Sequence, residues 1–216
     1  MEENLPLQKQ RENVSELGRA MLTQGLTKGT GGNISAREGD RVAISPSGMA
    51  YEDITPEDVP IVDLEGNKVA GDLDPSSEIA MHTGILRERE GIGGVVHNHS
   101  PYASTFASLG EPIPASHYLI AFVGDKIPVA PYETFATPEL AEVALETLGN
   151  EYTACLLENH GVVAVGETVD EAFEIATMVE YCARIQYQAV SIGEPKILPE
   201  EEIDTLLERF AGYGQH

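Results

Sequence analysis

The chain has 216 residues, 42% of them hydrophobic, and carries 36 acidic against 13 basic residues, for a formal net charge of −23. Its length and apolar content predict one folded domain over residues 1–216 and exclude a disordered chain, and its negative field excludes nucleic acid and anionic membranes as partners. No apolar run reaches the roughly 20 residues of a membrane span, and the acidic start Met1–Leu5 lacks a signal-peptide pattern, so we expect a cytoplasmic protein.

The first third of the chain predicts one helix followed by paired strands. Val14, Leu17 and Met21 recur at helical spacing, and Gly25 marks the end of a helix over residues 5–24. A short helix is expected to begin at Thr55-Pro56. Four strands are expected to form two hairpins, 33–37 with 41–45 and 61–64 with 68–70.

The remaining two thirds alternate helices with apolar strands. We expect helices over 76–90, 101–108, 137–149, 168–190 and 200–210, and strands over 94–99, 154–157 and 162–165. The connection over 112–124, rich in proline and glycine, is expected to be largely irregular. Cys155 and Cys182 have no CxxC partner and are expected to be free and buried. The pattern predicts a single sheet covered by helices.

The sharpest chemical feature is His97-Asn98-His99 at the end of a predicted buried strand. Residues two apart in a strand project from the same face, so both imidazoles can reach one ion. Sites on sheets also tend to collect at strand ends. Taken alone, however, the motif also fits two surface histidines.

His160 strengthens the metal interpretation. It follows the apolar strand 154–157 and precedes Gly161, at a turn that would present its ring. Three histidines from two strand ends, with a carboxylate nearby, match a catalytic zinc site with an open position. Glu158 is a rival ligand because it lies two residues before His160 and would share its face.

Glu78 is the candidate carboxylate. It lies near the start of the helix predicted at Ser76-Ser77, where acidic residues are favoured simply because they stabilise helix N-termini. A catalytic role requires a metal in front of that helix end. His82 lies four residues later on the same helical face, and it either supports Glu78 or only packs there.

Three segments rich in backbone N–H groups are candidates for binding an anion: Gly29–Asn33, Ser47-Gly48 and Ser76-Ser77. The first is not a dinucleotide fingerprint, because Ile34 occupies the last glycine position of GxGxxG, and the chain has no GxxxxGK[ST]. Each segment alone is commonly a turn or a cap. Together, in a chain this acidic, they predict a dedicated site for a negatively charged substrate group.

These motifs resemble the class II aldolase and adducin-head family. The matching segments occur in the family's order and cover nearly the whole chain: Gly29–Ser35, Ser45–Gly48, Pro75–Glu78, Val95–His99, Ile113–Tyr118 and Glu158–Gly161. The resemblance implies a three-layer α/β/α sandwich around a central, mainly antiparallel sheet. It also implies a ring-like homotetramer with active sites at the subunit interfaces.

The resemblance also implies roles for individual residues. It assigns one Zn²⁺ per subunit to His97, His99 and His160, and the acid/base role to Glu78. Tyr118 matches a catalytic tyrosine that completes the neighbouring subunit's site, and Tyr213 matches another tyrosine near the C-terminus. The residues implied to bind the substrate phosphate are Gly32, Asn33, Ser47, Gly48, Ser76 and Ser77.

The implied activity is the cleavage of a ketose 1-phosphate, such as L-fuculose 1-phosphate, to dihydroxyacetone phosphate and a small aldehyde such as L-lactaldehyde. Relatives with the same metal site leave two alternatives open, a pentulose-phosphate 4-epimerase and a methylthioribulose-phosphate dehydratase. A non-catalytic adducin-like binding module would be expected to have lost ligands, whereas all three histidines and Glu78 are present.

The acidic residues are dispersed along the chain and not gathered in one tail. This distribution is typical of the solvated surface of a protein from a high-salt cytoplasm, where counterions screen the self-repulsion. An ordinary acidic protein is the alternative.

Overall fold

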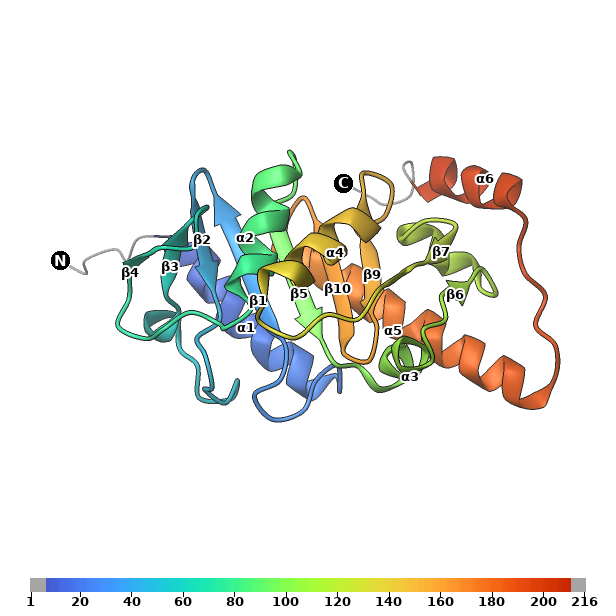
Figure 1. The fold of residues 1–216 in the computed structure, drawn as a ribbon, viewed down its shortest axis with the longest axis horizontal. Helices are drawn as coiled ribbons and strands as arrows, with labels where there is room; N and C mark the ends of the chain where they lie inside the picture. Colours follow the sequence, from blue (N-terminus) through green and yellow to red (C-terminus); the bar gives the residue numbers. More distant parts are fainter. Residues whose placement is uncertain (1–6, 211–216) are drawn as a thin grey trace.

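The structure, a computed structural model, describes residues 7–210 and is built on a central eight-stranded sheet (Figure 1). The strands are β1 Asn33–Glu38, β2 Arg41–Ile44, β3 Ile61–Asp63, β4 Lys68–Ala70, β5 Gly94–Asn98, β8 Val129–Ala130, β9 Ala154–Leu157 and β10 Gly161–Gly166. Their order across the sheet is β4-β3-β2-β1-β5-β10-β9-β8. All neighbours pair antiparallel except β8 and β9, which are parallel.

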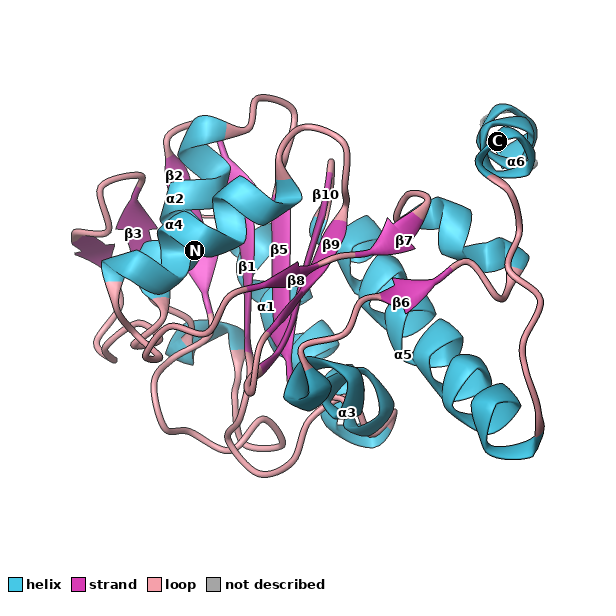
Figure 2. Ribbon diagram, turned by 45° about the vertical axis from the view of Figure 1, so that its right-hand side comes forward, coloured by secondary structure: helices cyan, strands magenta, loops and turns pink. Residues whose placement is uncertain are grey.

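Helices cover both faces of the sheet and produce three layers (Figure 2). One face packs against α1 (Gln8–Thr23), α3 (Pro101–Leu109) and α5 (Val169–Ile192), and the other packs against α2 (Ile79–Glu88) and α4 (Pro138–Leu148). Successive strand residues point to opposite faces, so Val96 lies in the first core and Val95 in the second. The predicted three-layer α/β/α fold with a mainly antiparallel sheet is confirmed. Among the described helices, none is both long and apolar enough to cross a membrane.

Local sequence signals explain several helix boundaries. Thr137 and Thr168 each accept a backbone hydrogen bond from the third residue beyond them, which caps the N-termini of α4 and α5. Gly110 ends α3 in a left-handed conformation with φ 66°. Cys155 and Cys182 are free and buried, as expected.

Two segments differ from the prediction in ways that affect the site. Helix α2 begins at Ile79 and not at Ser76, so both serines lie in the preceding loop and Glu78 is the N-cap residue. The connection predicted as irregular instead contains β6 (Ile113–Pro114), paired with β7 (Lys126–Ile127), and the 3-10 helix η2 (Tyr118–Phe122). These elements span two to five residues each, too few for a recognisable periodicity.

The last described helix, α6 (Glu200–Phe210), lies apart from the sheet at one end of the molecule (Figure 1). It contacts η2 through aromatic side chains, and the Phe210 ring stacks on Phe122 with centroids 4.5 Å apart. Phe122 and Tyr118 stay 41% and 47% exposed on the same short helix.

Candidate metal centre

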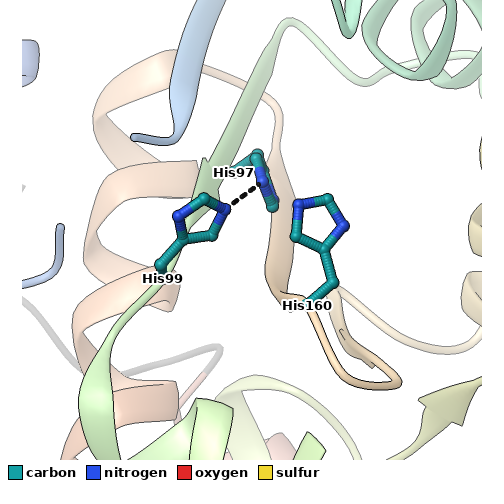
Figure 3. A group of neighbouring side chains, drawn as sticks. All are labelled: His97, His99 and His160. Carbon is teal, nitrogen blue, oxygen red and sulfur yellow. Dashed lines mark hydrogen bonds between the residues drawn. The ribbon is translucent and has the colours of Figure 1, made fainter. Parts of the chain in front are cut away.

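Three histidines converge at one end of the sheet, where β5 lies beside β10 (Figure 3). His97 belongs to β5, His99 follows its last residue, and His160 closes the turn between β9 and β10. Their ring centroids are 4.7 to 5.1 Å apart, and one ring nitrogen from each histidine lies within 4.8 Å of the other two. Asn159 adopts φ 54°, a left-handed conformation that asparagine tolerates in tight turns, and this turn carries His160 back toward β5.

A hydrogen bond to the backbone leaves one nitrogen of His97 free to bind an ion. His97 Nδ1 lies 2.8 Å from the carbonyl oxygen of Val162 and must donate to it, so Nε2 keeps its lone pair. That Nε2 lies 3.0 Å from Nε2 of His99. Burial and the neighbouring histidines lower the pKa of His97 well below its ordinary value, and burial with His160 lowers the pKa of His99. Both rings are therefore neutral near pH 7, the form that coordinates metal.

The carboxylate of Glu78 completes the cluster. Its Oε2 lies 3.3 Å from His97 Nε2 and its Oε1 lies 3.7 Å from His160 Nε2. Oε1 is buried and has no hydrogen-bond partner among the described residues. Because burial keeps His97 neutral, the carboxylate is not compensated by that ring, and a divalent cation between them would compensate it. Three imidazole nitrogens and a carboxylate oxygen are a donor set that Zn²⁺ accepts.

The side chain of Glu78 does not act as a simple helix cap. Glu78 occupies the N-cap position of α2, yet its side chain makes no capping hydrogen bond. The carboxylate instead accepts a hydrogen bond of 2.8 Å from Asn33 Nδ2. His82, one turn later, is fully buried between Ser35 and Asn33, and burial, followed by the proximity of a second titratable ring at His97, lowers its pKa to about 3.

A cleft of about 430 Å³ opens beside the histidines. All six residues predicted to bind phosphate line it together with Glu78, His99 and His160, whereas His97 lies buried behind them. The backbone N–H groups of Ser47 and Ser76 already donate to the carbonyl oxygens of Asp74 and Ser45. These two serines would therefore offer hydroxyls, not amides, to an anion.

The sequence prediction missed part of the lining of the cleft. Tyr132, Glu133 and Phe135 line it from the loop between β8 and α4, and Tyr132 and Phe135 are 56% and 64% exposed. Two exposed aromatic residues just before a capped helix are the available signal, but no spacing rule marks them. Glu158 supports this loop: its carboxylate accepts a 3.0 Å hydrogen bond from the Tyr132 N–H and does not join the histidine group, contrary to its interpretation as a rival ligand.

Tyr118 lies apart from this cleft. Its ring is on η2 beside His117 and Phe210, with centroids 4.9 and 6.1 Å away, and it is not among the residues that line the cleft. A role for Tyr118 in a neighbouring subunit's site stays a prediction. Tyr213 lies outside the described residues.

Residues 12–187 match the model of the family described as Class II Aldolase and Adducin N-terminal domain. The chain is 52% identical to the 5-deoxy-D-ribulose 1-phosphate aldolase of Bacillus thuringiensis, over 97% of this chain and 99% of the relative. It is 42% identical to the 5-methylthioribulose-1-phosphate/5-deoxyribulose-1-phosphate aldolase of Rhodospirillum rubrum, over 95% and 93% of the two chains. A solved L-fuculose 1-phosphate aldolase superposes with a TM-score of 0.93 at 38% identity, covering 97% of this chain and 99% of that one.

Proposed function

This chain belongs to the class II aldolase and adducin family and is a lyase of the class II aldolase type, and we propose that it cleaves 5-deoxyribulose 1-phosphate to dihydroxyacetone phosphate and acetaldehyde. The observation that carries the proposal is one cleft that borders a cluster of three converging histidines and is lined by a buried carboxylate and by glycines and serines. The finer choice of substrate follows the relatives at 52% and 42% identity, whose names both include 5-deoxyribulose 1-phosphate.

In the proposed site, His97, His99 and His160 hold one zinc ion, which when bound supplies a Lewis acid for negative charge on the substrate oxygens. Glu78 delivers a proton to C3 of the ketose as the C3–C4 bond breaks, and it removes that proton in the reverse direction. Tyr118 of the partner subunit acts as a phenolate that accepts the proton of the C4 hydroxyl in cleavage, and as a phenol that returns this proton to the aldehyde oxygen in synthesis.

The substrate phosphate is proposed to lie against the wall formed by Gly32, Asn33, Ser47, Gly48, Ser76 and Ser77. Within the described residues, neither lysine nor arginine lines the cleft, so N–H groups and hydroxyls would hold the anion. Fixing the phosphate away from the reacting carbons orients the C3–C4 bond toward Glu78.

Tyr132 and Phe135 suit the methyl end of a 5-deoxyketose, because their exposed rings add apolar surface to the lining of the cleft. L-Fuculose 1-phosphate, which would release L-lactaldehyde, is the second candidate substrate. The high structural similarity to an L-fuculose 1-phosphate aldolase favours it. The two aldehydes differ by one hydroxyl-bearing carbon.

Turnover of the purified protein tests the function. The panel comprises 5-deoxyribulose 1-phosphate, 5-methylthioribulose 1-phosphate, L-fuculose 1-phosphate and ribulose 5-phosphate, each assayed in low and high KCl with both products identified. We expect equal amounts of dihydroxyacetone phosphate and aldehyde, with the highest kcat/KM on 5-deoxyribulose 1-phosphate. An epimerised or dehydrated product without dihydroxyacetone phosphate would contradict the proposal.

Metal analysis tests the cofactor separately. Protein purified without added metal is expected to contain one zinc per chain, and a strong chelator should abolish cleavage until zinc is restored. Activity that survives complete removal of metal would exclude the metal-assisted reaction.

A further inference from the structure

Four buried polar side chains form a hydrogen-bonded chain that ends on Glu78. Ser35 Oγ lies 2.7 Å from His82 Nδ1, His82 Nε2 contacts Asn33 Oδ1, and Asn33 Nδ2 lies 2.8 Å from Glu78 Oε2. The exposed fractions are 0% for Ser35 and His82, 5% for Asn33 and 6% for Glu78. Buried polar groups of this kind are costly unless every member is paired, so their mutual geometry is strongly constrained.

The direction of each hydrogen bond follows from the Glu78 end. An ionised carboxylate only accepts, so Asn33 presents its Nδ2 to Glu78 and its Oδ1 to His82. His82 must then carry its proton on Nε2. Its Nδ1 is left as an acceptor for the Ser35 hydroxyl. The chain therefore has one polarity, from the serine hydroxyl to the carboxylate.

Two simple spacings bring the four residues together. Asn33 and Ser35 are two apart on β1 and project from the same face, while Glu78 and His82 are one helical turn apart. Asn33 is also the register partner of His97 on β5. The chain thus ties the start of α2 to the strand next to the metal centre.

The hydrogen-bonded chain fixes the orientation of the Asn33 side-chain amide. An asparagine amide rotated by half a turn would point Oδ1 at the Glu78 carboxylate, and two acceptors would face each other in a buried site. The Nε2–H of His82 blocks that rotation because it needs Oδ1 as its acceptor. The Ser35 hydroxyl donates to Nδ1 in this tautomer, so both ring nitrogens of His82 are paired.

We propose that Ser35 and His82 are positioning residues that act through Asn33 to aim the Glu78 carboxylate at the reacting carbon. Asn33 is then shared between two tasks, because only its second Nδ2 hydrogen stays available for the substrate phosphate. The inference rests on the proposed function in one respect, that the reaction of Glu78 is a proton transfer.

The central test compares His82→Leu with His82→Gln. Leucine removes the donor but keeps an apolar volume, whereas the glutamine amide can place an N–H near the position of Nε2. We expect His82→Leu to keep its fold and zinc and to lose about 10- to 100-fold in kcat with little change in KM. His82→Gln should recover most of that loss. Thr83→Val is the matched control, because the Thr83 hydroxyl donates to Ile79 O on the same helix and takes no part in the chain from Ser35 to Glu78, and it should retain wild-type kcat.

A double-mutant cycle distinguishes positioning through Asn33 from a general structural effect. If His82 acts through Asn33, His82→Leu should add little to the loss already caused by Asn33→Leu. Additive losses, or near-normal kcat in folded, zinc-loaded His82→Leu, would overturn the proposal. If His82→Leu fails to fold, Ser35→Ala takes its place, with a smaller expected loss in kcat and the same cycle.

A measurement without substrate separates this proposal from the proposed function. NMR of protein labelled with ¹⁵N-histidine reports which ring nitrogen of His82 carries the proton. We expect Nε2–H in the wild type and in Ser35→Ala, because Asn33 Oδ1 is the acceptor for that proton in both. An Nδ1–H ring in the wild type would overturn the proposal even in an active aldolase. An Nε2–H ring in a protein that cleaves no ketose phosphate would instead reject the proposed function.

Discussion

Glu78 is the residue whose charge decides what the histidine cluster can do. Its carboxylate is the anionic group that faces His97 and His160 inside the described part of the site, and one of its oxygens lacks any other partner there. A carboxylate in that position can either share in holding a cation or exchange a proton with a carbon acid bound beside it. The two roles respond differently to a neutral isostere.

Glu78→Gln should therefore keep zinc and lose proton transfer. The amide preserves size and an acceptor for Asn33, but it has no titratable oxygen, so exchange of the C3 proton of dihydroxyacetone phosphate with deuterated solvent should fall roughly 10²- to 10⁴-fold. NMR of the exchange and elemental analysis measure the two properties on the same sample. Near-normal exchange would remove Glu78 from the acid/base role.

The buried histidines make the metal-free protein sensitive to acid. The pKa of His82 falls to about 3 in the fold, and the pKa values of His97 and His99 are also lowered from 6.5, chiefly by burial. Below pH 6.5 the unfolded chain thus binds more protons than the folded chain, so the free energy of unfolding decreases as the pH falls. Melts of metal-free protein between pH 6.5 and 5 should show a falling Tm, with a shallower fall in His82→Gln. A constant Tm over this range would contradict the assignment.

At the scale of elements, two glycines let three strands approach closely around the histidines. A Cβ on Gly32 would lie 2.6 Å from the carbonyl oxygen of His97, and a Cβ on Gly161 would lie 2.3 Å from that of Asn98. Gly32 also has φ +71°, which a side chain disfavours. The backbones before β1 and at the start of β10 thus pack directly against the end of β5.

Gly161→Ala should loosen the metal centre as well as the fold. The added methyl group would also lie 2.8 Å from His99 Cδ2, so β10 must move away from β5. We expect a loss of about 1–3 kcal/mol in the free energy of unfolding, together with weaker zinc binding. Gly84→Ala is the control, because no described atom outside the neighbouring backbone of its own helix lies within 4 Å of its added Cβ, and it should gain up to about 1 kcal/mol. Denaturant melts and zinc titration measure both effects, and an unchanged zinc affinity in Gly161→Ala would contradict the packing argument.

Features that depend on short stretches of sequence could be predicted, whereas contacts between distant elements could not. Hydrophobic periodicity located most helices and strands. The candidate metal ligands were located by the pair His97 and His99 at one strand end and by His160 after another strand. The Asn33–His82 contact was not predicted, because it depends on which helix covers which strand, and that is a long-range property. The aromatic side chains of Tyr132 and Phe135 were missed because loop residues show no hydrophobic periodicity. Strand β8 was missed because two residues are too few to show one.

At the scale of the whole molecule, the net charge of −23 acts on stability through self-repulsion. Mobile ions shorten the range of that repulsion to about 3 Å at 1 M salt, so we expect the Tm to rise steadily from low to molar KCl. Thermal melts across that series decide the question. A flat or falling Tm would reject the high-salt interpretation and leave an ordinary acidic protein.

Tyr118 connects the predicted assembly of subunits with the chemistry of the site. Tyr118 is partly exposed on the 3-10 helix η2 and lies outside the cleft of its own chain, although the family resemblance gives it a catalytic role. Both facts are compatible if the phenol enters the cleft of a neighbouring subunit. Tyr118→Phe should then keep zinc and the predicted tetramer, while cleavage slows by roughly 10²- to 10⁴-fold through loss of a proton-transfer group.

Mixing inactive subunits tests this arrangement directly. Glu78→Gln subunits retain an intact Tyr118, and Tyr118→Phe subunits retain an intact Glu78. In a mixed oligomer, some interfaces would pair the intact Glu78 of one subunit with the intact Tyr118 of the next, and activity should return at those sites alone. If Tyr118 served its own subunit, no mixture could place both intact residues in one cleft, because each parent chain lacks one of them. Differently tagged chains, co-purified after exchange, establish that mixing has occurred. Activity in the mixed fraction that stays at the level of the inactive parents would therefore exclude catalysis by Tyr118 across the interface.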